Sequence, residues 1–229
     1  MGVFLHLPLL EDLDLKITVL TNETNYFQYA AISTEELLES IISSTKRLMS
    51  LTYEDGSGSS SFPVRHDAPR LKDILDNHAH TLRNLSIVLT NNDTKDWRME
   101  QEFSDIEGYF GTMTNFTELR SLSIQLEVLL GRPEADSHLK DVLPRKLYSF
   151  TGLALPDYHG VEDCDRLWEE KDCQRQFEEL AEVAEDGNTF GSLKSVYMEV
   201  GRKDFFNSLR GGIYEDGILG RSRIIFGWR

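Results

Sequence analysis

The chain has 229 residues, of which 40% are hydrophobic and 28% charged, which is the composition of an ordinary globular protein and not of a disordered one. A chain of this length buries about 70% of the surface that its unfolded state exposes, so its stability requires neither a disulfide nor a metal. The formal net charge of -15 at pH 7 disfavours nucleic acid and anionic membranes as partners, because both require a cationic footprint.

Targeting features are also missing from the sequence. No run of about 18 apolar residues occurs, so no transmembrane segment is expected. The start of the chain lacks the basic residues and long apolar stretch of a secretory signal. Cys164 and Cys173 lie on different faces of a helix-like stretch, which disfavours a disulfide between them. We therefore expect an intracellular protein, cytoplasmic or nuclear.

Helical and strand patterns alternate along the chain. A first helix is expected to open at Thr34, a capping residue followed by two glutamates, and to lead directly into a strand. A second should begin at Asp67, because proline in the following turn suits a helix start. Further helices are expected over 137–143, 162–185 and 205–209, and an edge strand over 223–228.

Two segments interrupt this alternation. The run of Gly and Ser near 55–62 is expected to be a flexible loop. The segment 91–114 is longer than a usual connection and is expected to hold a helix or an excursion on the outer side. Neither breaks the repeat, so the sequence predicts a single domain over 1–229, with an atypical C-terminal cap over 201–229.

A strand motif, L-x-x-L-x-L or a close variant, recurs at intervals of 28 to 46 residues. Fixed internal spacing of this kind is typical of stacked repeats. Helix-then-strand units imply parallel strands joined by crossovers. The predicted fold is therefore α/β, a solenoid arc with a parallel sheet on the concave side and helices on the convex side. The motif covers 10–15, 48–53, 82–87 and 119–124, with looser copies over 147–153 and 193–198.

The residues between the motif leucines are expected to point away from the helices, toward the concave surface. They are small and polar, which suits contact with a protein partner, and Tyr197 is the best aromatic anchor among them. The predicted contact set is Asp12, Asp14, Lys16, Ser50, Thr52, Glu54, Asn84, Ser86, Ser121, Ser123, Gln125, Ser195, Tyr197 and Glu199.

These motifs resemble a known family. The stretch 116–125 reads FTELRSLSIQ and is followed by LLG at 129–131 and LPRKL at 143–147. Together with the repeated strand motif, this resembles the leucine-rich-repeat region of fungal F-box-type proteins. The resemblance implies a leucine-rich-repeat-like solenoid. It also implies that the chain is the substrate-recognition part of a ubiquitin ligase subunit, which holds a protein partner while other subunits perform the chemistry.

The chain departs from that family in three respects, the first being that its repeats are longer and more irregular than the common 20–29 residues. The Asn that often follows the repeat strand is replaced by Thr18, Gly56, Thr90 and Glu127. No F-box is recognised, since the candidate segment 34–50 lacks the Leu-Pro opening and its helix suits the outer layer of a repeat. The F-box adaptor is thus a partner only if an F-box precedes Met1. Either the chain is an incomplete gene product, or it is a repeat protein that has lost its adaptor-binding segment.

Catalytic and cofactor motifs are not found. The sequence holds no nucleophile elbow, phosphate loop, zinc pattern or dinucleotide fingerprint, so neither an enzyme nor a cofactor is expected. His78 and His80 lie about 200° apart on a helix, which disfavours a metal pair. The acidic residues of 163–173 are interleaved with Arg166 and Lys171, as on a solvated helix face.

Two alternatives to a ligase subunit stay open. One is a stand-alone leucine-rich-repeat scaffold with no link to ubiquitin. The other is an extracellular repeat protein, which the glycosylation-type sequences at Asn22, Asn84, Asn92 and Asn115 would suit.

Overall fold

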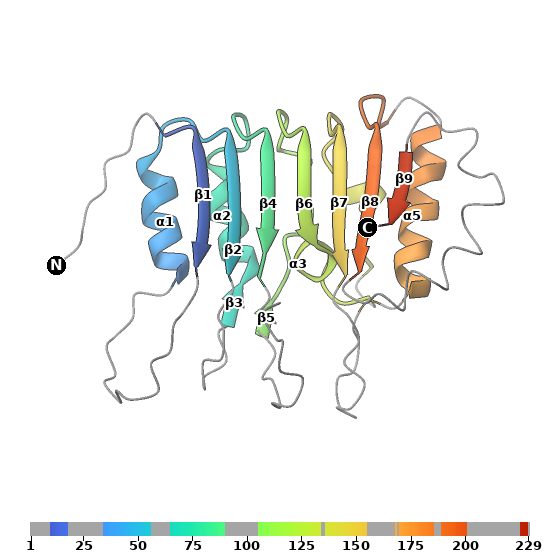
Figure 1. Cartoon of the computed structure of the whole chain (residues 1–229), viewed down its shortest axis with the longest axis horizontal. Helices are drawn as coiled ribbons and strands as arrows, with labels where there is room; N and C mark the ends of the chain where they lie inside the picture. Colours follow the sequence, from blue (N-terminus) through green and yellow to red (C-terminus); the bar gives the residue numbers. More distant parts are fainter. Residues whose placement is uncertain are drawn as a thin grey trace.

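The computed structural model describes residues 10–17, 34–55, 65–89, 105–133, 136–154, 168, 170–185, 189–200 and 225–228. The principal element is a seven-stranded sheet in which the strands follow one another in chain order, each parallel to the last (Figure 1). Its strands are β1 (Asp12–Ile17), β2 (Ser50–Asp55), β4 (Asn84–Val88), β6 (Ser121–Gln125), β7 (Ser149–Ala154), β8 (Ser195–Val200) and β9 (Ile225–Trp228).

One hydrophobic residue from each strand joins a continuous row across the sheet. The row consists of Leu13, Leu51, Leu85, Leu122, Phe150, Val196 and Phe226. The predicted parallel sheet and the common register of the motif are therefore confirmed. The looser motif copies keep the register because aromatic and β-branched side chains also suit the pleated surface of a sheet.

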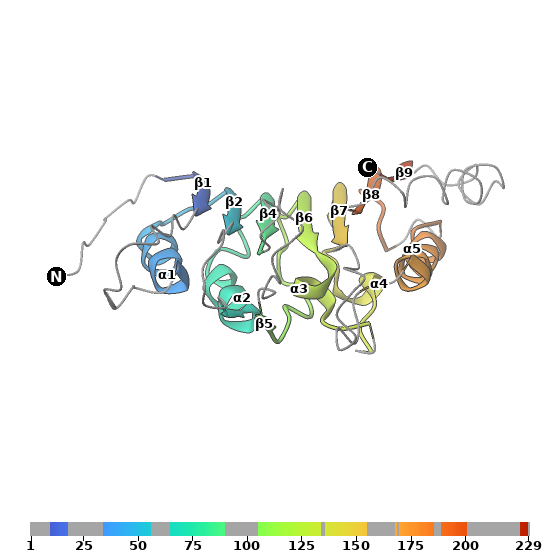
Figure 2. The ribbon, with the colours of Figure 1, turned by 60° about the horizontal axis from the view of Figure 1, so that its bottom comes forward.

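The helices of the described chain lie together on one side of the sheet (Figure 2). They are α1 (Thr34–Ser44), α2 (Ala68–Asp76), α3 (Leu126–Leu130), α4 (Leu139–Val142) and α5 (Glu170–Glu185). The helix α1 contacts α2, α4 contacts α5, and α3 packs against β6 and β7. None of these helices covers the opposite side of the sheet, which we call the open face.

The helix starts test the capping predictions directly. The α1 helix begins at Thr34, as predicted. At α2 the Asp67 carboxylate accepts a hydrogen bond from the backbone N–H of Arg70 at 2.9 Å, and proline occupies the first turn. The predicted helix over 162–185 needs correction, since Trp168 precedes α5 and is not helical. Its indole N–H instead donates to the carbonyl of Gly131 at 3.0 Å, which ties the approach to α5 to the end of α3.

Some elements were not predicted. A second sheet pairs β3 (Arg65–Asp67) with β5 (Asp105–Glu107), and three-residue strands are too short to produce a periodic pattern. The helix α3 is buried at four of its five positions, so it has no polar face by which to recognise it. The edge strand expected over 223–228 is confirmed by β9. The loop near 56–61 and the helix over 205–209 lie outside the described residues.

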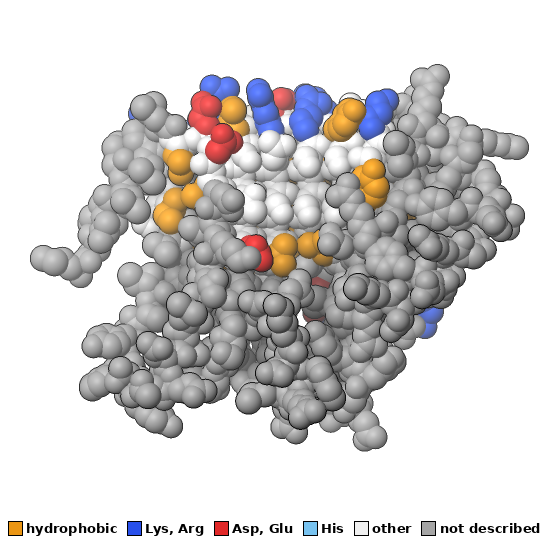
Figure 3. Space-filling view, in the orientation of Figure 1, with side chains coloured by type: hydrophobic (Ala, Val, Ile, Leu, Met, Phe, Trp, Pro, Cys, Tyr) orange, Lys and Arg blue, Asp and Glu red, His pale blue; other side chains and the backbone are white. Residues whose placement is uncertain are grey.

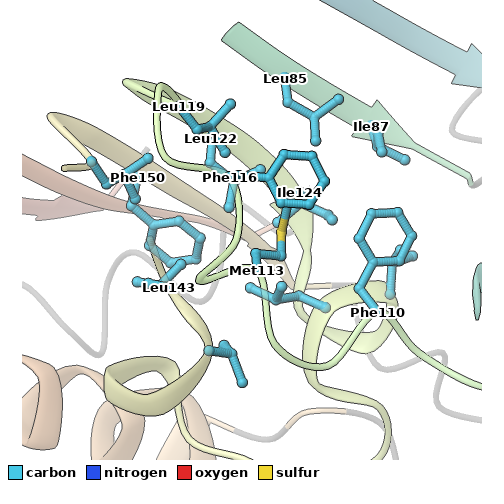
Figure 4. Packing of buried hydrophobic residues seen from close by; sticks show 14 of the residues in the cluster. Leu85, Ile87, Phe110, Met113, Phe116, Leu119, Leu122, Ile124, Leu143 and Phe150 are labelled. Carbon is cyan, nitrogen blue, oxygen red and sulfur yellow. The ribbon is translucent and has the colours of Figure 1, made fainter. Parts of the chain in front are cut away.

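The core between sheet and helices is continuous. Between β5 and β6 the chain places Phe110, Met113 and Phe116 beneath the inward side chains of the strands (Figure 4). Each large apolar side chain buried in this way stabilises the fold by about 1.5–3 kcal/mol. A helix or outer excursion was expected over 91–114. Its described end instead supplies β5 and core residues.

A buried histidine links the first two helix–strand units. His78 is 5% exposed, and its Nδ1 accepts the backbone N–H of Leu48 at 3.4 Å. The neutral ring therefore carries its proton on Nε2, which lies 3.2 Å from the carbonyl of Ile42 and donates to it. His80 is exposed, with Nδ1 3.2 Å from the hydroxyl of Thr117. The two rings thus have different partners and different surroundings.

Candidate protein-interaction face

The open face carries two adjacent rows of small polar side chains. Successive side chains of a strand point to opposite faces, and the alternate residues of these strands are buried against the helices. The remaining residues therefore face outward in register. The first row is Ser50, Asn84, Ser121, Ser149 and Ser195, and the second is Thr52, Ser86, Ser123, Thr151 and Tyr197.

The side chains of these two rows are uncharged. Asn84 is exposed, and the other members of the two rows are partly exposed. The Ser, Thr and Asn members belong to the pale central surface of Figure 3, which has charged side chains along its upper border. Hydroxyl and amide groups can donate and accept hydrogen bonds without the desolvation cost of a charge. Such a surface suits close contact with polar groups of another protein.

Neighbouring members of a row interact across the strands. The hydroxyl of Ser195 donates to the hydroxyl of Ser149 over 3.1 Å. Neighbouring members of one row lie on adjacent strands, which are about 4.8 Å apart. Because the backbone ladder fixes this spacing, the face is preorganised before any partner binds.

Most of the predicted contact set lies on this face. Asp12 is exposed at the start of β1, and Glu54 is partly exposed in the register position beyond Thr52. Asp14, Lys16 and Glu199 hold corresponding register positions, but their side chains lie outside the described part.

Gln125 is a correction to the predicted set. Its side chain is 1% exposed, and its Oε1 accepts the backbone N–H of Leu89 at 2.8 Å. The amide therefore satisfies the main chain beyond β4 and is not presented to a partner. Alternation alone placed Gln125 outward, but the end of β6 is covered.

Two members of the face were missed from the sequence. Ser149 and Thr151 stand on either side of Phe150 in β7 and complete the rows between β6 and β8. The signal was available, because β7 was expected and its alternation follows from the buried Phe150. The looser motif over 147–153 obscured it.

A second feature borders the face where the strands begin. Backbone hydrogen bonds connect the residues that precede the strands. The N–H of Arg83 donates to the carbonyl of Met49 at 2.7 Å, and the N–H of Arg120 donates to the carbonyl of Arg83 at 2.8 Å. The N–H of Tyr148 donates in turn to the carbonyl of Arg120 at 2.7 Å. The N–H of Lys194 continues this series, donating to the carbonyl of Tyr148 at 2.8 Å. Each of these residues follows the first leucine of its motif copy, or Leu147 or Leu193 in the looser copies. This spacing could have identified the row from the sequence.

Cations dominate this border, which appears as the blue side chains at the top of Figure 3. We call the group the basic ridge and define it by its members. They are Arg47, Arg83, Arg120, Lys146 and Lys194, all of them exposed.

Two carboxylates lie beside the basic ridge. The ammonium of Lys146 donates to Glu118 at 3.1 Å, and Arg120 approaches the same carboxylate at 3.9 Å. The hydrogen bond from Lys146, reinforced by the neighbouring cations, lowers the pKa of Glu118 below its ordinary value. Arg47 lies 3.6 Å from Glu11. Exposed pairs of this kind are weak and can exchange one carboxylate for another.

The remaining chemistry of the described residues is limited. No group of three or more His, Cys, Asp or Glu among them is arranged to hold a metal ion. Of the helices in the described ranges, none combines the length and the apolar character needed to cross a membrane. No protein-family model, curated protein or solved structure matches the chain.

Proposed function

We propose that this protein is a leucine-rich-repeat-like solenoid that recognises another protein through its open face, as the substrate-recognition region of an F-box-type ubiquitin ligase subunit. In this role the chain performs no chemistry. It holds a bound partner in place, and the transfer of ubiquitin belongs to other subunits.

One observation carries the protein-recognition proposal. Across β2, β4, β6, β7 and β8, two consecutive register rows present small, mostly uncharged side chains on a side of the sheet that no described helix covers. The alternate residues of the same strands are buried, so the outward rows are free to vary without loss of the core. A broad face held rigid by a backbone ladder suits recognition of a protein better than of a small molecule.

Photo-crosslinking tests this assignment. A benzophenone amino acid placed at Ser86 or Ser123 would lie on the open face, whereas Asp73 on α2 gives a matched exposed control on the helical side. Crosslinks to a defined protein should form at the first two positions, disappear with excess unmodified chain, and be absent at Asp73. Equal crosslinking from Asp73, or products that the unmodified chain does not displace, would contradict recognition through the open face.

A second candidate is the stand-alone repeat scaffold. The segment that would be the F-box candidate forms α1, which packs on α2 in the helical layer and joins the core through Leu38 and Ile42. Its apolar face is therefore already used. This favours a scaffold unless a separate F-box precedes the chain.

Capture by purified F-box adaptor separates the two candidates. The chain as given and a version extended upstream in the genome should be compared on immobilised adaptor. Capture of the extended form alone supports the ligase subunit. Capture of neither form, with open-face crosslinking retained, supports the stand-alone scaffold.

A further inference from the structure

The basic ridge is opposite in sign to the protein as a whole. The chain carries a formal net charge of -15, yet the ridge gathers Arg47, Arg83, Arg120, Lys146 and Lys194 along one edge of the sheet. Like charges brought together repel one another and cost stability. Such a row therefore suggests a function beyond folding.

The cations of the ridge are only partly compensated. Arg120 and Lys146 share Glu118, and Arg47 is paired loosely with Glu11. For Arg83 and Lys194 the described part of the chain provides no hydrogen bond or ion pair to the side chain. Both are exposed. Arg83 acts on Glu118 only at longer range, helping to lower its pKa, so both charges can meet a ligand without breaking a short ion pair of the described residues.

The geometry of the ridge fits an extended chain. Four strand-to-strand steps separate β2 from β8, which at about 4.8 Å each gives a length of about 19 Å. An extended peptide advances about 3.3 Å per residue, so about six residues would follow the ridge. The hydroxyl rows begin one residue further along each strand, within reach of the peptide's polar groups.

An aromatic side chain stands within the ridge. Tyr148 is 54% exposed, and backbone hydrogen bonds place it between Arg120 and Lys194. Tyrosine and arginine are the residues that most often dominate binding energy at protein interfaces. Tyr148 can cover an apolar side chain of a bound segment while its neighbours pair with carboxylates.

We propose that the basic ridge binds an extended acidic segment, about six residues long, of the protein partner that the open face recognises. This inference rests on the proposed function and specifies the chemistry of the partner. A protein segment fits better than a nucleic acid, because the strong negative charge of the whole chain opposes the approach of a phosphate backbone. Charge pairing at the edge would also accelerate association and fix the orientation of the partner on the face.

Fluorescence anisotropy with synthetic peptides provides the test. One labelled probe is an unstructured peptide containing Glu-Tyr-Glu-Glu-Leu-Glu, and its match replaces every Glu by Gln. The full chain should bind the Glu peptide at least about tenfold more tightly than the Gln peptide, with an affinity that falls as salt rises. Equal binding of the two peptides would overturn the proposal.

Charge-reversal variants locate the site. Arg83→Glu combined with Lys194→Glu should weaken binding of the Glu peptide about tenfold or more, because two attractive contacts become repulsive. The control Arg132→Glu makes the charge change of one of these two substitutions at an exposed residue after α3, in the helical layer, and should leave binding unchanged. Equal loss in the control, or no loss in the double variant, would overturn the proposal. So would a single-stranded oligonucleotide that competes more strongly than the Glu peptide.

The failure of this inference is distinct from failure of the proposed function. If open-face crosslinks survive in the Arg83→Glu, Lys194→Glu variant at wild-type yield, the partner does not use the ridge, but recognition through the face stands. If no displaceable crosslink forms at all, the proposed function falls.

Discussion

The two faces of the sheet are built from alternate residues of the same strands and obey opposite requirements. In β6, Leu122 and Ile124 are buried against the helical layer, while Ser121 and Ser123 are partly exposed. The buried face must match the volume of its neighbours. The open face must remain polar and otherwise has few constraints. The buried residues of the strands therefore specify the architecture, and the residues between them are available for recognition.

The largest expected effect on the free energy of unfolding comes from replacing a buried strand residue. Leu122→Ala should lower the free energy of unfolding by about 3 kcal/mol, since it removes apolar contacts and leaves a cavity. Ser123→Ala, one residue further along, should change it by less than about 0.5 kcal/mol. Urea unfolding followed by circular dichroism measures both. Similar effects at the two positions would contradict the division between the faces.

A polar side chain inside the helical layer should also be costly to remove. His78→Ala deprives the buried Leu48 N–H of its acceptor and removes one of the donors to the Ile42 carbonyl, which keeps the N–H and hydroxyl of Thr45. A loss of about 2 kcal/mol in unfolding free energy is expected. The exposed neighbour provides the control, because His80→Ala should cost less than about 0.5 kcal/mol. Thermal and urea unfolding of the two variants would be compared. A larger effect at His80 would count against the role assigned to the buried ring.

Gln125 tests where the open face ends. Gln125→Ala leaves the buried N–H of Leu89 without its acceptor, and a loss of about 1–2 kcal/mol is expected. Gln174→Ala on the partly exposed surface of α5 should have little effect. Hydrogen exchange at the Leu89 amide should increase in the Gln125 variant. Unchanged exchange would show that this amide does not depend on Gln125.

The smallest expected effect lies on the outer surface of the helical layer. Glu179 is 2.8 Å from the ring of His138 and 3.0 Å from Lys140. The His138 contact lacks the alignment of a hydrogen bond. Burial raises the pKa of Glu179. The ammonium of Lys140 and the other nearby positive charges outweigh this and hold the pKa of Glu179 below its ordinary value. The carboxylate of Glu179 therefore stabilises the contact between α4 and α5.

Because the folded-state pKa of Glu179 is lowered, its stabilising effect is complete above the ordinary value of 4.5 and disappears as the pH falls below it. Glu179→Gln should cost about 0.5 kcal/mol at neutral pH and progressively less in acid. Urea unfolding at a series of pH values measures this. A cost that grew on acidification would reverse the sign and refute the assignment. Glu178→Gln, one residue away on the exposed side, is the control.

The sequence anticipated those features that depend on local chemistry. The Asp67 cap, with proline two residues later, placed the start of α2, and the leucine spacing placed each strand of the sheet up to β8. Side-chain alternation then assigned the outward rows wherever the motif was regular. It missed Ser149 and Thr151, because the motif is irregular there. Alternation also placed Gln125 outward, since no local signal reveals that its amide will be buried against the backbone N–H of Leu89.

The sequence by itself thus determined which residues are inward and which outward, because hydrophobic periodicity is a property of the chain alone. Only the tertiary structure decided which outward residues become neighbours. Successive arginines and lysines of the basic ridge are 26 to 48 residues apart in the sequence, and only strand pairing brings them together along one edge. The short pairing of β3 with β5 depended on the same cause, since the contacts that stabilise it are distant in the sequence.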